Sequence, residues 1–110
     1  MKKRIPGKIK NIIKEADKEF RHIYSSRLKK IILYGSYARG DYSDESDIDL
    51  IILLDDMKNV NEERNNYLPV ISRLSLKYDT LISAIPCNYK DFYNIKTPLF
   101  LNINREGIEI

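Results

Sequence analysis

A glycine and a serine, followed after ten residues by two aspartates, form the most informative pattern of the chain: Gly35-Ser36, then Asp47 and Asp49. Glycine at the end of a strand lets a ligand approach the backbone, and free N–H groups beside a serine hydroxyl bind anions such as phosphate. Aspartates at i and i+2 of a strand point to one face, roughly 7 Å apart. Magnesium is usually bound by one or two carboxylates together with substrate phosphates. The spacing therefore predicts a site for a triphosphate and its metal ions.

Two further charged residues are candidates for the same site. Asp79 precedes a predicted strand and becomes a third carboxylate if that strand lies beside the one carrying Asp49. Such a carboxylate would bind the metal that lowers the pKa of an attacking hydroxyl, and would accept its proton. Arg39 is the only basic residue between residues 31 and 57, and its guanidinium would neutralise a triphosphate or a leaving pyrophosphate.

The sequence thus predicts two overlapping sets of site residues. The predicted catalytic and metal-binding residues are Asp47, Asp49 and Asp79, and the predicted nucleotide-binding residues are Gly35, Ser36 and Arg39.

Hydrophobic periodicity predicts the elements that position these residues. Apolar residues at spacings of three and four predict an amphipathic helix from Pro6 to about Ser25. Apolar runs predict strands over 30–34, 47–54 and 80–85, with a brief helix over 36–39. The strand over 47–54 should be central in its sheet, because its second half is apolar on both faces.

The second half of the chain continues the alternation of helices and strands. Asn59, with Glu62 three residues later, predicts a capped helix start, and Pro69 should kink that helix or mark a later start. Pro86 should end the third strand. Short helices around 91–93 and 98–101 and an edge strand over 108–110 complete the chain. This order predicts the α/β (α+β) class, with a small mixed sheet and helices packed on it.

Composition limits the class of protein. A length of 110 residues suits one domain spanning 1–110. The hydrophobic fraction of 43% is higher than a disordered chain would carry. The longest apolar run, over 48–54, is too short to cross a bilayer. The single Cys87 cannot form an intramolecular disulfide, and no apolar segment follows the charges at the N-terminus. We therefore expect a cytoplasmic protein with no membrane partner.

The net charge of +3 conceals an uneven distribution of charge. Residues 1–34 carry eleven basic and three acidic side chains, which leaves a net charge of −5 for the remainder. Seven acids and no base lie between Asp41 and Asp56. Crowded carboxylates are unfavourable unless they stay in water or bind a cation. The basic helix suggests nucleic acid, but its charges lack interleaved aromatics, so a solvated face is the favoured interpretation.

The two segments Gly35-Ser36-Tyr37-Ala38-Arg39-Gly40 and Ser46-Asp47-Ile48-Asp49-Leu50 resemble the signature of the polymerase-β-type nucleotidyltransferases. Among these the chain is most similar to the minimal nucleotidyltransferases, antitoxins encoded beside HEPN-domain ribonuclease toxins. The resemblance covers nearly the whole chain and implies their fold. It also assigns the triphosphate to Gly35 and Ser36, and two magnesium ions to the three aspartates.

The resemblance further implies an activity and a partner. AMP would pass from ATP to a tyrosine hydroxyl of the HEPN toxin, with release of pyrophosphate, and more than one AMP can be added. Bulky anionic phosphates near a ribonuclease site would repel the RNA backbone and silence the toxin. Homo-oligomers or hetero-oligomers are compatible with this activity.

Three alternatives stay open on the sequence alone. In the first alternative, the acceptor of AMP is a small molecule such as an aminoglycoside, although 110 residues leave little room for a domain that binds it. In another, the protein is a non-catalytic antitoxin that acts by occlusion. The third concerns two aromatics that flank the site: Tyr37 and Tyr42 either stack on an adenine, or Tyr37 fills the core.

Overall fold

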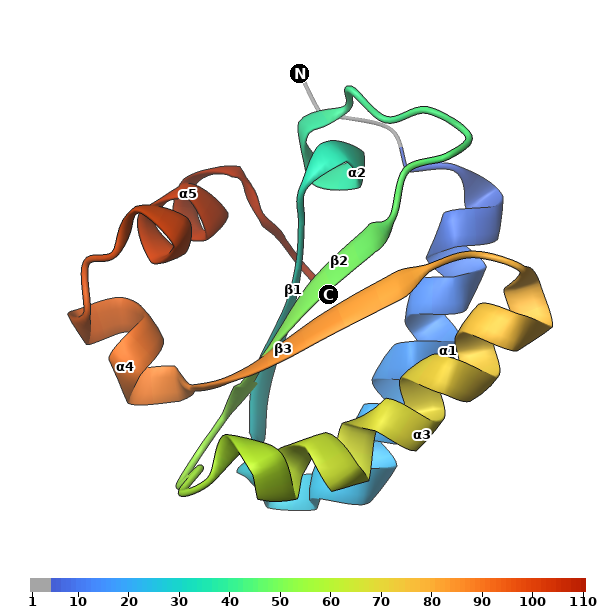
Figure 1. The fold of residues 1–110 in the computed structure, drawn as a ribbon. Helices are drawn as coiled ribbons and strands as arrows, with labels where there is room; N and C mark the ends of the chain where they lie inside the picture. The colour runs from blue at the N-terminus through green and yellow to red at the C-terminus, as the bar shows by residue number, and fades with distance from the viewer. Residues whose placement is uncertain (1–4) are drawn as a thin grey trace.

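A four-stranded sheet carries helices on both of its faces in the computed structural model, which describes residues 5–110 (Figure 1). The strand order is β3-β2-β1-β4. β1 runs antiparallel to β2 and β4, and β2 runs parallel to β3. The predicted mixed sheet with a central second strand is therefore confirmed. The strands are β1 Leu28–Tyr34, β2 Ile48–Leu54, β3 Ile82–Asn88 and β4 Ile108–Glu109.

The helices divide between the two faces of the sheet (Figure 1). On one face, α1 (Gly7–Tyr24) packs beside α3 (Val60–Tyr78), and on the other lie α4 (Tyr89–Asn94) and α5 (Pro98–Glu106). The one-turn helix α2 (Ser36–Arg39) follows β1, and a 3-10 turn, η1 (Ser25–Arg27), precedes β1. No helix within residues 5–110 is long and apolar enough to cross a membrane.

The alternation of side chains along β2 links the core to the site. Ile48, Leu50, Ile52 and Leu54 pack in the cluster formed with α1 and α3. Ile51 and Leu53 pack in the cluster formed with α4 and α5. Because side chains alternate along a strand, Asp49 shares the face of α4 and α5. The sheet thus carries its carboxylate on the face that α5 partly covers.

The third strand differs from its prediction, because it starts later and continues through Pro86. The backbone N–H of Ile48 donates to the carbonyl of Leu81. The N–H and C=O groups of every second residue, counted from Leu81, therefore point toward β2. Pro86 falls on the outward-facing positions of this edge strand, where a missing N–H costs no bond to β2. The prediction that Pro86 ends the strand is therefore wrong.

The start of α3 agrees with its prediction, and Pro69 does not interrupt the helix. The side-chain oxygen of Asn59 accepts a hydrogen bond from the N–H of Asn61 at 2.8 Å, which confirms the cap. The helix is continuous through Pro69, so the predicted later start is wrong. Pro69 and Asn65 both lie on the exposed side of α3, where the carbonyl that loses its helical partner remains accessible to water.

An ion pair with a buried carboxylate joins three elements at the end of the sheet away from Asp47 and Asp49. Glu63 of α3 is the one buried charged residue among residues 5–110. It pairs with Arg27 of η1 and accepts a hydrogen bond from Asn66 at 3.1 Å. The Arg27 carbonyl also accepts a hydrogen bond from the N–H of Asp55, the residue after β2, and the Arg27 Nε donates to the Asp55 carbonyl. Burial, and then the charge of Glu63, raise the pKa of Tyr24, whose hydroxyl donates to the Glu63 carbonyl.

Arg27→Met should lower the free energy of unfolding by about 2–3 kcal/mol, because it leaves the Glu63 carboxylate buried without its cation. Urea denaturation monitored by circular dichroism measures this loss. Arg21→Met is the matched control, since Arg21 forms an exposed ion pair with Asp17 on α1, and its loss should cost less than about 0.5 kcal/mol. Equal losses in the two variants would contradict a structural role for the buried pair.

Candidate active site

The turn between β1 and α2 has a backbone shape that requires glycine. Gly35 has φ 79° and ψ −156°, a region that residues with a side chain essentially never occupy. A Cβ at this position would overlap the Oδ2 atom of Asp49. The carbonyl of Gly35 accepts hydrogen bonds from the N–H groups of Ala38 and Arg39 at 3.1 and 3.0 Å. The turn therefore brings bare backbone against a carboxylate of β2.

Two carboxylates lie together at the start of β2. Asp49 pairs in register with Tyr34 of β1 and Ser83 of β3, and Asp47 precedes the strand by one residue. Asp47 is exposed, whereas Asp49 is half-buried. Burial raises the pKa of Asp49, and the charge of Asp47 raises it further, while Arg39 opposes the shift. Burial therefore disfavours the ionised form of Asp49 in the absence of a bound cation.

This donor set fits magnesium. Hard oxygen ligands from one or two carboxylates, completed by substrate phosphates and water, are the usual protein contribution to a magnesium site. The bare backbone of Gly35 leaves the oxygen of Asp49 uncrowded. Among residues 5–110 no three acidic, histidine or cysteine side chains lie close enough together to share one metal ion. Asp47 and Asp49 would therefore hold the metal as a pair.

Arg39 lies at the edge of the same site, at the end of α2. Its Nε donates to Asp41 Oδ2 at 3.2 Å, and its Nη1 is 3.9 Å from Glu106 Oε2 of α5. These two carboxylates hold the guanidinium near the Gly35-Ser36 turn while leaving it partly exposed. A cation in this place suits the phosphates of a nucleotide.

A groove of about 550 Å³ joins these groups, and we name it the α5 groove. Five of the six predicted site residues line it: Gly35, Ser36, Arg39, Asp47 and Asp49. The opposite wall comes from α5, through Leu99, Asn102, Ile103 and Glu106. Sequence reasoning predicted a short helix in this segment but gave no signal that it faces the aspartates, because that depends on how the C-terminal residues pack on the sheet.

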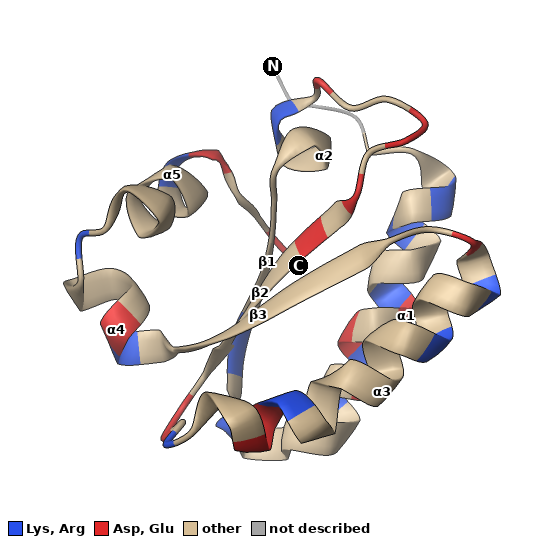
Figure 2. Cartoon of the chain, in the orientation of Figure 1, with Lys and Arg blue, Asp and Glu red and all other residues tan. Residues whose placement is uncertain are grey.

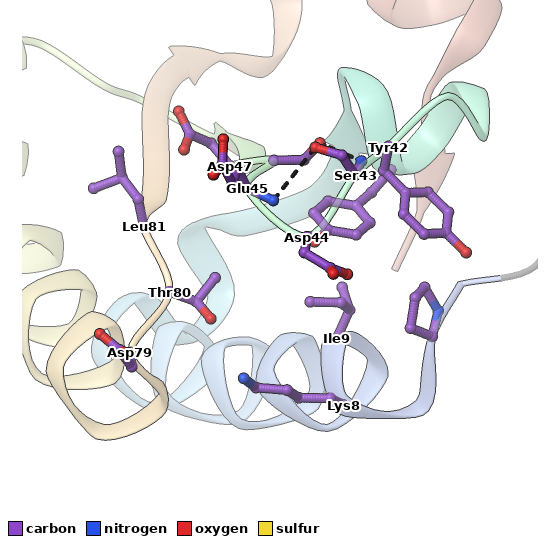
Figure 3. Close-up of a pocket in the computed structure, with 13 residues that line it drawn as sticks. Lys8, Ile9, Tyr42, Ser43, Asp44, Glu45, Asp47, Asp79, Thr80 and Leu81 are labelled. Atoms are coloured by element: carbon purple, nitrogen blue, oxygen red, sulfur yellow. Dashed lines mark hydrogen bonds between the residues drawn. The ribbon is translucent and has the colours of Figure 1, made fainter.

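Asp79 lies elsewhere than the strand entrance predicted for it. It ends α3 in the left-handed conformation, with φ 50° and ψ 49°, and β3 begins only at Ile82. The β3 residue opposite Asp49 is Ser83. Asp79 lines a second cavity instead, together with Asp47 (Figure 3). The structure therefore does not bring Asp79 into the α5 groove, and its role as a third metal ligand stays a prediction.

This second cavity, of about 400 Å³, is named the Tyr42 pocket here. It lies between the N-terminal end of α1, the loop from α2 to β2, and the segment between α3 and β3 (Figure 3). Tyr37 on its wall is buried in the core and stacks on Tyr42, with ring centroids 4.8 Å apart and planes 22° apart. Tyr37 therefore fills the core, and Tyr42 is the more exposed ring of the stack.

Comparison with known proteins places this site in a family. The sequence model of the family described as nucleotidyltransferase domain matches residues 9–104. A protein of Methanocaldococcus jannaschii named as a candidate protein adenylyltransferase is 43% identical over 99 residues, which cover 90% of this chain and 95% of that protein. A second protein of the same organism, named in the same way, is 44% identical over 73 residues, covering 66% and 67% of the two chains.

Solved structures share the fold at lower identity. The crystal structure of a toxin–antitoxin with AMP-PNP gives a TM-score of 0.64 at 21% identity, covering 94% of this chain and 72% of that chain. A mutant of the MntA–HpeT toxin–antitoxin gives 0.62 at 21% identity, with the same coverage. The predicted fold and enzyme class are confirmed. Because the family match spans most of its length and includes both segments of the site, the chain belongs to the nucleotidyltransferase domain family.

Proposed function

We propose that this nucleotidyltransferase is a magnesium-dependent protein adenylyltransferase. It transfers AMP from ATP to a tyrosine hydroxyl of a partner toxin, a HEPN-domain ribonuclease, and thereby acts as the antitoxin of the pair. Residues 1–110 serve as one domain, and we place the reaction in the cytoplasm. The observation that carries the proposal is the carboxylate pair, Asp47 and Asp49, set against the Gly35-Ser36 turn in one groove.

The geometry supports binding of a nucleotide through its phosphates. In the α5 groove, the backbone and hydroxyl of Gly35-Ser36 bind phosphate oxygens, and the Arg39 guanidinium neutralises part of their charge. Asp47 and Asp49 would hold magnesium, which neutralises phosphate charge and lowers the pKa of an attacking hydroxyl. The protein thus contributes mainly positioning and electrostatic complementarity.

The transfer exchanges one bond to phosphorus for another. The tyrosine oxygen of the acceptor bonds to the α-phosphorus of ATP, and the bond from that phosphorus to the oxygen bridging to the β-phosphate breaks. Pyrophosphate leaves, and the hydroxyl proton passes to solvent. The choice of a protein acceptor is supported by relatives named as candidate protein adenylyltransferases, and the choice of a toxin by the toxin–antitoxin structures of similar fold.

Intact mass measurement of the partner tests the proposal. The purified chain is incubated with ATP, Mg²⁺ and the protein encoded beside it, and the partner should gain one or more adenylyl groups. Chelation of the metal, or Asp47→Asn in the enzyme, should abolish the gain. An unmodified partner would contradict the proposal. An Asp47→Asn variant that still protects cells from the toxin would favour neutralisation by occlusion.

A further inference from the structure

We infer that the Tyr42 pocket receives the acceptor, and that Asp44 and Asp79 on its walls select an acceptor hydroxyl carried on a basic segment. The part of this inference that concerns AMP transfer rests on the proposed function. It assigns Asp79 the role of a specificity residue, in place of the metal ligand that the sequence predicts.

The position of the pocket beside the carboxylate pair is the first argument. Asp47 lines both the α5 groove and the Tyr42 pocket, as do Glu45 and Ser46 immediately before it. The two cavities therefore open onto the same carboxylate from different sides. A reaction with two substrates requires two approaches to one reacting centre, and this arrangement provides them.

The groups that can bind phosphate lie in one of the two cavities, and this difference decides which substrate enters each. The Tyr42 pocket is lined by four carboxylates, those of Asp44, Glu45, Asp47 and Asp79, and by one described cation, Lys8. The α5 groove is lined by as many carboxylates, those of Glu45, Asp47, Asp49 and Glu106, but it also contains Arg39 and the Gly35-Ser36 turn. A triphosphate fits the groove, where the turn, the arginine and the magnesium that Asp47 and Asp49 would hold offset its charge, and the pocket lacks the turn and the arginine. The pocket is therefore left for the acceptor, and its charge favours a cationic one.

The acidic residues around the pocket come from separate segments of the chain. Figure 2 shows acidic residues along the loop from α2 to β2, at the start of β2 and at the end of α3 that carries Asp79. After burial, the charges of Asp44 and Asp47 are among the causes that raise the pKa of Tyr37 on the pocket wall. These carboxylates on the pocket wall would attract lysine or arginine side chains.

The uncharged walls of the pocket suit the stems of such side chains. The ring of Tyr42 is exposed on one side and stacked on Tyr37, and Leu81 is 62% exposed at the rim near Asp79 (Figure 3). Lysine and arginine pack their methylene stems on apolar surface while their charged ends reach carboxylates. An arginine or lysine over a tyrosine ring gains a further cation–π attraction. A basic peptide segment therefore fits both the charge and the surface of the pocket.

Peptides with one tyrosine test the inference in two measurements. Three short peptides carry the tyrosine between lysines, between glutamines or between glutamates. Fluorescence anisotropy measures their binding in the presence of Mg²⁺ and a non-hydrolysable ATP analogue, and mass spectrometry measures AMP transfer with ATP. The lysine peptide should bind roughly 10-fold more tightly than the glutamate peptide, because several exposed charge pairs add. High salt should reduce this preference.

Asp79→Asn separates a specificity role from a catalytic one. Asparagine tolerates the left-handed conformation of this position, so the end of α3 should be preserved. The variant should lose about 3-fold in binding of the lysine peptide and less in binding of the glutamine peptide. Glu62→Gln, which removes a carboxylate about 26 Å away at the other end of α3, is the control and should change neither measurement.

Two outcomes would overturn the inference. One is equal or undetectable binding of all three peptides by the wild-type chain. The other is loss of transfer to every peptide in Asp79→Asn, which would make Asp79 a catalytic carboxylate. Failure of the proposed function is distinguishable: the lysine preference would then persist in binding, while no peptide or partner protein accepts AMP.

Discussion

Asp47→Asn and Asp49→Asn should each lower the rate of AMP transfer by about 1,000-fold, since each removes one of two carboxylates available for the metal, an effect of several kcal/mol. Single-turnover transfer from labelled ATP measures the loss. Asp56→Asn is the control, because Asp56 is an exposed acid after β2 and lines neither the α5 groove nor the Tyr42 pocket. Near wild-type rates in Asp49→Asn would contradict the assignment of the carboxylate pair.

The same substitution at Asp49 should stabilise the metal-free fold. Burial and the charge of Asp47 raise the pKa of Asp49 in the folded state above its ordinary value of 3.8. The folded state then binds this proton more tightly than the unfolded state, so stability falls as pH rises through the interval between the two pKa values. Above that interval the ionised carboxylate is a cost that asparagine removes.

Thermal unfolding in the presence of a metal chelator tests whether the ionised Asp49 destabilises the fold. Asp49→Asn should melt at a higher temperature than the wild-type chain at neutral pH, and the difference should shrink below pH 3.8, the ordinary pKa of the group. Added Mg²⁺ should raise the melting temperature of the wild-type chain and not that of the variant, because a ligand stabilises only the state that binds it. A variant that melts earlier in the chelator would show that Asp49 stabilises the fold by contacts other than a bound metal.

Gly35→Ala should damage both stability and activity. A side chain at φ 79° and ψ −156° is strained by about 1–3 kcal/mol, and its Cβ would overlap the carboxylate of Asp49. Asp49 must then shift, and a displacement of about 1 Å in a reacting geometry can cost roughly 100-fold in rate. Urea denaturation and single-turnover transfer measure the two effects.

Gly7→Ala is the matched control for that change. A Cβ on Gly7 meets no atom within 4 Å, and the position lies in the first turn of α1. Alanine should be neutral there, or stabilise the helix by up to about 1 kcal/mol. If both glycine variants behaved alike, the close approach of the turn to Asp49 would have no functional meaning.

Local features of the site could be predicted because they depend on neighbours in sequence. The strand that ends at Tyr34, the turn at Gly35-Ser36 and the capped helix start at Asn59 all follow from residue types and short-range periodicity. The common face of two residues at i and i+2 is also a property of a single strand. The five predicted site residues that line the α5 groove lie on the turn after β1, on α2 and at the start of β2, and the pairing of β1 with β2 brings these segments together.

Features that depend on packing between distant segments could not be predicted in this way. Pro86 lies within β3 because an edge strand leaves its outward N–H positions free, and strand order is not written in the residues of that strand. Asp79 was assigned to a strand entrance, but the left-handed end of α3 and two further residues separate it from β3.

The sequence by itself determined the chemistry of the proposed phosphate and metal site, because backbone freedom at Gly35 and the spacing of Asp47 and Asp49 are short-range properties. Only the tertiary structure decided what surrounds that chemistry. Packing of apolar faces against the sheet sets α5 across the groove and brings α1, the loop before β2 and the end of α3 together around the Tyr42 pocket. Such packing depends on surfaces contributed by segments far apart along the chain, which no local pattern specifies.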